Sequence, residues 1–214
     1  MRAALLCALL GVADGLRTSI AGHPVRRVDD ASTGLFVYAV VFGEPAAPGA
    51  AAHDALATQL WPSARVAARA LERLPRFGSV VELGAGTGLP SLAAARAGAK
   101  VLATDRDATS LAYAAAAADD QGLALATAVF DVADFAAPLP PADVVVVADV
   151  FVTDAVAAAC GRRVGEALRR GSTCVVADAR RSTRDAFLAA LRAEGFSGAF
   201  GASEDPPLLL LDGE

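Results

Sequence analysis

A glycine-rich turn after a short apolar run is the segment of this sequence best suited to bind a ligand. The run Val80–Leu83 contains Glu82, and Gly84, Gly86 and Gly88 follow it at alternate positions. Glycine allows a tight backbone turn and lets a ligand approach the chain closely. A carboxylate beside such a turn repels a pyrophosphate and attracts a cation. The turn is therefore predicted to hold a ligand that carries positive charge.

Two further acidic residues are expected at the same edge of the fold. Asp105 ends the apolar run that begins at Lys100, and Asp131 follows Phe130 at the end of the next run. A carboxylate after the second strand can accept hydrogen bonds from both hydroxyls of a ribose. One after the third strand can accept from the amino group of an adenine, a role that Asp134 is near enough to share. An acid for an ammonium group, one for a ribose and one for an adenine together predict S-adenosylmethionine as the ligand.

An alternation of short apolar runs and helical stretches positions these acids. Strands are predicted over 35–42, 80–83, 100–104, 123–130, 144–147, 174–176 and 208–211, and helices over 62–74, 91–97, 109–118, 156–169 and 185–193. The valine run 144–147 has no polar alternation, which is typical of a strand covered on both faces. Continuous apolar strands between helices predict an α/β fold. We expect a Rossmann-like, doubly wound, mostly parallel seven-stranded sheet with helices on both faces.

Charge and composition exclude several classes of function. A net charge of −5 leaves no basic excess for phosphates, so no nucleic-acid partner is expected. The longest apolar stretch, Ala3 to Leu10, is too short to cross a bilayer, which takes about 20 residues, so no membrane association is expected. The three cysteines contain no CxxC pair and neither histidine has a partner at ligand spacing, so no metal site is expected.

Residues 1–30 differ from the rest and are predicted to be a targeting segment, with the folded domain at 31–214. A short basic start precedes an apolar run, small residues follow at 11–13, and the stretch from Arg17 to Arg27 contains arginines but no acid. This pattern suits entry into a chloroplast, a mitochondrion or the secretory route. The alternatives are an apolar N-terminal helix that packs on the domain and a cytoplasmic location.

The loop from Glu82 to Gly88, together with Asp105 and Asp131, resembles the cofactor motifs of class I S-adenosylmethionine-dependent methyltransferases. The combination of loop, acids and strand order makes this resemblance more specific than the glycine loop alone. The cofactor-binding residues that it implies are Trp61, Glu82, Gly84, Ala85, Gly86, Asp105, Asp131 and Ala148.

A narrower resemblance is to the family 16 branch of these enzymes, and it runs from about Thr33 to the C-terminus. Leu60–Ala64 is similar to the first helix of that branch, which implies that Trp61 lies against the cofactor; a core aromatic is the other interpretation. Ala148–Val152 resembles a motif of Asp followed three residues later by Tyr, although Val152 stands at the Tyr position. Ala177–Arg181 resembles a Gly-Asp-Pro-Gly-Arg stretch. The branch contains protein-lysine methyltransferases and nicotinamide N-methylase-like proteins.

Asp149 is the predicted catalytic residue. It follows the fourth strand of the repeat series, where it could orient an acceptor amine and stabilise the positive charge that moves onto nitrogen. The alternative is a capping carboxylate for the helix that begins near Thr153. Asp178, Arg180 and Arg181 could meet a substrate carboxylate or an acidic protein surface, or they could form a charged cluster at a helix start.

The leading functional hypothesis is an N-methyltransferase that acts on a protein lysine side chain. A small-molecule N-methyltransferase acting on a nicotinamide-like amine is the second. Because Val152 replaces the family tyrosine, a catalytically silent cofactor-binding partner protein is the third. An NAD(P) oxidoreductase is disfavoured, since Glu82 repels a pyrophosphate and Leu89 occupies the third glycine position of the dinucleotide fingerprint.

Overall fold

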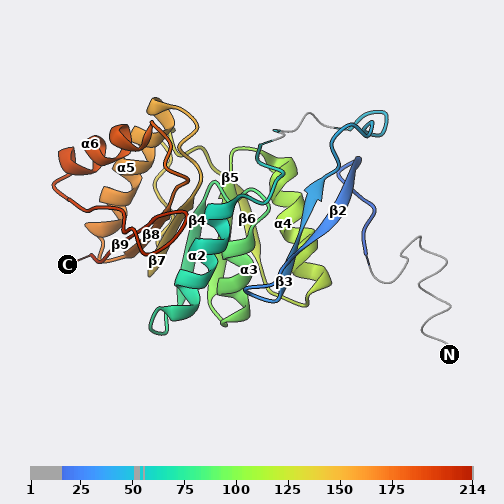
Figure 1. The fold of residues 1–214 in the computed structure, drawn as a ribbon, viewed down its shortest axis with the longest axis horizontal. Helices are drawn as coiled ribbons and strands as arrows, with labels where there is room; N and C mark the ends of the chain where they lie inside the picture. The colour runs from blue at the N-terminus through green and yellow to red at the C-terminus, as the bar shows by residue number, and fades with distance from the viewer. Residues whose placement is uncertain (1–15, 51–53, 55, 214) are drawn as a thin grey trace.

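The computed structural model, which describes residues 16–50, 54 and 56–213, is built on one six-stranded sheet (Figure 1). The strand order is β6-β5-β4-β7-β8-β9. The neighbouring pairs are parallel except β8 with β9, which are antiparallel. The strands are β4 (Ser79–Leu83), β5 (Lys100–Asp105), β6 (Ala126–Val129), β7 (Val144–Ala148), β8 (Thr173–Ala177) and β9 (Leu208–Leu211).

Helices cover both faces of this sheet, which confirms the predicted Rossmann-like α/β fold. They are α2 (Pro62–Arg73), α3 (Leu89–Arg96), α4 (Ala108–Asp120), α5 (Asp154–Leu168) and α6 (Arg184–Ala193). Alternate strand residues point to opposite faces. Val145 and Val147 pack towards α5 and α6, whereas Val144 and Val146 pack towards α2 and α3. This explains why the valine run lacks polar alternation.

The predicted count of seven strands in one sheet is wrong. The apolar run 35–42 forms β3 (Leu35–Val40), but β3 belongs to a separate antiparallel sheet with β1 (Ser19–Ile20) and β2 (His23–Asp30). This small sheet lies beside α4, at the end of the molecule opposite α5 and α6 (Figure 1). Val37 and Tyr38 are fully buried in a cluster with residues of α3 and α4. The run therefore owes its apolar character to a helix layer, not to the main sheet.

The folded region begins before the predicted boundary at residue 30. The backbone N–H of Arg17 donates to the Tyr38 hydroxyl at 3.1 Å, and the Arg17 guanidinium makes two hydrogen bonds of 3.0 Å to the Asp120 carboxylate. Strands β1 and β2 follow directly. Most of the predicted targeting segment, residues 1–15, lies outside the described residues, so the targeting signal itself stays a prediction.

The chain reverses direction across the sheet at β4, and this reversal creates a binding crevice. The connection after β4 leads to β5 on one side, whereas β7 pairs with β4 on the other. In open α/β sheets, ligands bind at such a switch point, outside the carboxyl ends of the strands. The loops that follow β4, β5 and β7 therefore converge on one site.

Within the described residues, no helix is both long and apolar enough to cross a membrane.

Candidate cofactor site

A pocket lies at the carboxyl ends of β4, β5 and β7, where the switch point predicts it. All nine site residues expected from the sequence line it: Trp61, Glu82, Gly84, Ala85, Gly86, Asp105, Asp131, Ala148 and Asp149. The alternative adenine acid, Asp134, is not among its lining residues. Residues that were predicted from their positions at strand ends, and that lie far apart in the sequence, are therefore neighbours in one pocket.

The glycine loop between β4 and α3 leaves room that a side chain would fill. Gly84 and Gly86 have φ values of +70° and +53°, a left-handed conformation that favours glycine. A Cβ at Gly84 would come within 2.6 Å of Val150, and one at Gly86 within 2.8 Å of the Ala57 carbonyl oxygen. The Ala85 N–H donates to the Thr104 carbonyl at 2.8 Å, which ties the loop to β5. The loop thus presents bare backbone to the pocket.

Glu82 is almost completely buried at the end of β4, with 1% of its surface exposed. Its Oε2 accepts hydrogen bonds from the backbone N–H of Ser91 at 2.9 Å and from the Ser91 hydroxyl at 2.5 Å. Burial outweighs these bonds and raises the pKa of Glu82 to about 8. A cation beside this carboxyl group would favour its ionised form.

Asp105 ends β5 and is also buried. Its Oδ2 accepts from the Gly86 N–H and its Oδ1 from the Asp107 N–H, both at 2.9 Å. Burial is the main cause that raises the pKa of Asp105. Each carboxylate oxygen has a second lone pair, so a ribose hydroxyl can still bind. The two backbone bonds fix the orientation of this acid against the glycine loop.

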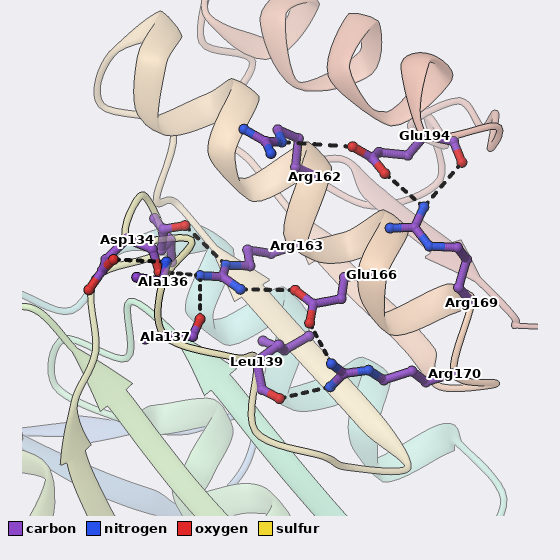
Figure 2. A network of polar contacts seen from close by, with 11 residues as sticks. Asp134, Ala136, Ala137, Leu139, Arg162, Arg163, Glu166, Arg169, Arg170 and Glu194 are labelled. Atoms are coloured by element: carbon purple, nitrogen blue, oxygen red, sulfur yellow. Dashed lines mark hydrogen bonds and ion pairs between the residues drawn. The ribbon is translucent and has the colours of Figure 1, made fainter.

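Asp131 is exposed, and a buried arginine of α5 holds the loop that carries it. The Asp131 carboxylate accepts from the Ala133 N–H at 2.8 Å. Arg163, only 1% exposed, donates to the carbonyl oxygens of Val132 at 3.2 Å, Asp134 at 2.6 Å and Ala137 at 3.0 Å (Figure 2). Arg163 also forms an ion pair with Glu166 at 2.9 Å, which balances the charge of the buried guanidinium. This role could not be predicted from the sequence, since Arg163 lies on a helix that follows the loop by about 30 residues.

Asp54, Leu56, Ala57 and Gln59 also line the pocket and, unlike Trp61, were not expected from the sequence. Asp54 pairs with Arg106 at 3.0 Å, and the Asp54 N–H donates to Asp107 at 3.2 Å. The Trp61 indole N–H donates to the Leu56 carbonyl at 2.8 Å. An isolated aspartate in a small-residue loop carries no pattern that could have predicted these contacts.

Asp149 lies at the pocket, but backbone groups already occupy its carboxylate. Its Oδ2 accepts from the Ser63 N–H at the start of α2, and its Oδ1 accepts from the Ala179 N–H after β8, both at 3.1 Å. Its side chain is 1% exposed. The cap of α5 is instead Thr153, whose hydroxyl accepts from the Val156 N–H. Asp149 therefore joins α2, β7 and β8; its predicted catalytic role stays a prediction.

The pocket is also lined by an arginine and by exposed apolar side chains. Arg181 lines it, with its guanidinium carbon 5.6 Å from the centroid of the Trp61 ring. Val152 is 42% exposed and also lines it, as does Leu56 at 51%. Asp178 and Arg180 do not line the pocket. In the described part of the chain, no group of three or more histidine, cysteine, aspartate or glutamate residues could hold a metal ion.

Comparison with known families identifies the central part of the chain. Residues 80–171, from β4 to the end of α5, match the family model described as a methyltransferase domain. This part of the chain therefore resembles a methyltransferase domain. S-adenosylmethionine is the cofactor of this domain, as the three strand-end acids predicted. No protein of curated function matches the sequence.

Solved structures with a similar fold include methyltransferases of several kinds. A TehB-like SAM-dependent methyltransferase from Corynebacterium glutamicum is 17% identical over 69% of this chain and 86% of its own, with a TM-score of 0.55. A 16S rRNA methyltransferase from Thermus thermophilus, solved with AdoMet and guanosine, is 18% identical over 89% of this chain but only 50% of its own, with a TM-score of 0.64. A ribosomal protein methylase from Lactobacillus delbrueckii subsp. bulgaricus is 18% identical over 78% and 84%, with a TM-score of 0.56. At these identities the likeness shows the fold alone.

The pocket of the methyltransferase domain fits its cofactor. The backbone at Gly84 and Gly86 approaches a ligand in a space that a Cβ would fill. Glu82 offers a carboxyl group for an ammonium, and Asp105 keeps lone pairs for ribose hydroxyls. Phe130 and Val132 flank Asp131 with apolar surface suited to an adenine ring. The ammonium, the ribose and the adenine of S-adenosylmethionine thus each have a chemically matched group in the pocket.

Proposed function

We propose that the protein is an N-methyltransferase that transfers a methyl group to the lysine side chain of a protein. The observation that carries this proposal is that a fourth acid, Asp149, lines the pocket beside the three acids that match the cofactor. Exposed apolar surface at Leu56 and Val152 borders the same pocket. An acidic pocket with an apolar border suits an amine on an aliphatic stem.

The chain's own residues would hold the reactants in line. When bound, S-adenosylmethionine supplies a methyl group activated by a sulfonium. Glu82 would hold its ammonium, and Asp105 its ribose. Alignment of the amine with the breaking bond supplies much of the acceleration in such displacements. The amine must arrive uncharged, and burial beside apolar groups such as Val152 favours its neutral form.

Asp149 would assist this reaction mainly through position. Its carboxylate fixes the start of α2 and the segment after β8, the two walls nearest Trp61 and Arg181. Its negative charge would also stabilise the charge that develops on the acceptor nitrogen. The resemblance of Leu60–Ala64 to the family 16 branch supports the choice of lysine, as Trp61 at the start of α2 lines the pocket.

A small amine is the second candidate acceptor, and Arg181 is the observation that favours it. A guanidinium at the pocket suits a metabolite that carries a carboxylate as well as an amine. The third candidate, a silent cofactor-binding partner protein, follows from Val152 at the position of the family tyrosine. A nucleic-acid acceptor is not proposed, since the net charge is −5.

The first test is calorimetric titration of the full chain with S-adenosylhomocysteine, with NAD as the control ligand. We expect binding of S-adenosylhomocysteine alone, weakened about tenfold or more by Asp105→Asn, because hydrogen bonds to a charged group are the stronger ones. Asp119→Asn, a change at an acid with 74% of its side chain exposed, is the matched control. Binding of NAD instead would overturn the proposal.

Radiolabelled S-adenosylmethionine then separates the acceptors. We expect label in lysine-containing peptides when the protein is incubated with cell proteins. Label in a metabolite fraction would favour the small amine. A protein that binds the cofactor but labels neither pool, even after Val152→Tyr, would be a silent partner.

A further inference from the structure

Arg181 lines the pocket, and its guanidinium donates no hydrogen bond within the described part of the protein. Its Nε is buried and has no hydrogen-bond partner. The nearest carboxylate oxygens, Oδ1 of Asp149 and Oδ1 of Asp178, are each 3.8 Å from that nitrogen, beyond hydrogen-bond distance. A guanidinium carries five N–H donors in a planar fork. The Arg181 side chain as a whole is 29% exposed, so a ligand in the pocket would meet the terminal N–H groups of this fork, not the buried Nε.

Other donors bind three of the four oxygens of these two acids, whereas Oδ1 of Asp178, like Nε of Arg181, is buried without a hydrogen-bond partner. Asp149 accepts one backbone N–H on each oxygen. Oδ2 of Asp178 accepts from the Arg181 N–H at 3.0 Å and from two nitrogens of Arg184, at 3.2 and 2.9 Å. These bonds hold both carboxylates in place, and the Arg181 guanidinium lies between them, beside the Trp61 ring. The two carboxylates and the Trp61 ring therefore surround the guanidinium, while its terminal N–H groups have no hydrogen-bond partner in the described residues.

We propose that Arg181 binds a carboxylate group of a ligand in the pocket. The inference rests on the proposed function, since it assigns a subsite of the same pocket. The planar fork of an arginine matches a carboxylate with two parallel hydrogen bonds. The carboxylates of Asp149 and Asp178 each lie 3.8 Å from the same guanidinium and would repel a further anion. A ligand group with a single negative charge is repelled less than a doubly charged phosphate and therefore fits better. The carboxylate belongs either to the amino-acid end of the cofactor or to the methyl acceptor.

The experiment compares the wild-type chain with Arg181→Met, Arg181→Lys and the control Arg180→Met. Arg180 adjoins it in sequence but is exposed and pairs with Asp205 away from the pocket. Binding of S-adenosylhomocysteine and of 5′-methylthioadenosine, which lacks the amino-acid carboxylate, is measured by calorimetry. Benzoate and nicotinate are then titrated onto free and S-adenosylhomocysteine-loaded protein. Their readout is the fluorescence of Trp61, the only tryptophan of the sequence.

Two results would support the proposal and identify the source of the carboxylate. If Arg181→Met weakens S-adenosylhomocysteine about tenfold or more while methylthioadenosine is unaffected, the arginine binds the cofactor. If S-adenosylhomocysteine is unaffected, but the loaded wild type and Arg180→Met bind benzoate or nicotinate and Arg181→Met does not, the arginine binds the acceptor. Arg181→Lys should retain only part of either affinity, because it keeps the charge and loses the fork.

Equal binding of every probe by wild type and Arg181→Met would overturn the proposal. Failure of the wild type to bind S-adenosylhomocysteine would overturn the proposed function instead. In that case the benzoate and nicotinate titrations of the free protein still decide the role of Arg181. A dependence on Arg181 would support the carboxylate subsite alone, and its absence would remove it.

Discussion

At the scale of single residues, Glu82 links cofactor binding to pH. Burial raises its pKa from an ordinary value of 4.5 to about 8, so the group is mostly protonated at neutral pH without a ligand. An ammonium beside it favours the carboxylate, and binding then releases a proton. We expect the affinity for S-adenosylhomocysteine to rise between pH 6 and pH 8, by up to about tenfold for each pH unit. Calorimetry across this range measures the slope.

Glu82→Gln is the control for this prediction. Its amide oxygen can still accept from Ser91, so the turn at the start of α3 is retained. The variant should bind more weakly and with a flat pH profile. The raised pKa also makes the ligand-free wild type lose stability as pH rises from about 4.5 towards 8, since the folded state binds the proton more tightly there. If the affinity of the wild type for S-adenosylhomocysteine did not change between pH 6 and pH 8, the prediction would be contradicted.

Gly86 tests whether the pocket depends on bare backbone. Gly86→Ala adds a left-handed alanine, at a cost of about 1–2 kcal/mol, and brings a Cβ within 2.8 Å of the Ala57 carbonyl. We expect this clash to displace Ala57 and its neighbours at the pocket and to abolish S-adenosylhomocysteine binding. Gly98→Ala is a matched control, because Gly98 also has a positive φ but an added Cβ meets no described atom within 4 Å. Its stability should fall while its affinity is unchanged.

The acids at strand ends could be predicted from the sequence because local patterns decide where they lie. Asp105 and Asp131 each follow an apolar run, and parallel pairing brings their strand ends to one edge. Asp54 and Arg163 could not be predicted in this way. Their contacts join segments that only the tertiary fold brings together. For the same reason, the hydrogen bond from the start of α2 to Asp149 could not be predicted from the sequence.

At the scale of elements, α5 controls the loop that presents Asp131. Arg163→Met leaves the carbonyls of Val132, Asp134 and Ala137 without their donor (Figure 2). It also leaves Glu166 without one of its two arginine partners. Removal of one member of a buried charged cluster costs about 3–5 kcal/mol. We expect urea denaturation to show a loss of this size, with weaker S-adenosylhomocysteine binding in the protein that remains folded.

Arg162→Met is the matched control for this prediction. Arg162 precedes Arg163 on α5 and also stacks on Phe135, but it is half exposed and makes only a 3.8 Å ion pair with Glu194 (Figure 2). An exposed pair of this kind is worth about 1 kcal/mol or less. If both variants lost the same stability and affinity, the loop would not depend on the buried arginine.

The elements themselves were more predictable than their partners. The proline at position 62 and the apolar spacing that follows it correctly predicted α2, because Pro favours the first turn of a helix. The apolar run at 35–42 correctly predicted β3 as a strand but not its sheet. Six consecutive buried residues look alike whether helices or other strands cover them. Which layer covers a strand is decided by tertiary packing.

At the scale of the whole molecule, the N-terminal strands are part of the fold, and we propose that any targeting segment ends before Arg17. A chain that begins at residue 16 should be as stable as the full chain. One that begins at residue 31 loses Ile20 and Val25, each worth about 1.5–3 kcal/mol, and leaves β3 without its partner strand. It also loses the bonds from Arg17 to Tyr38 and Asp120. We expect its Tm to fall by roughly 6 °C or more, at about 2–4 °C for each kcal/mol. Thermal unfolding of the three chains decides, and equal Tm values would restore the domain boundary to residue 30.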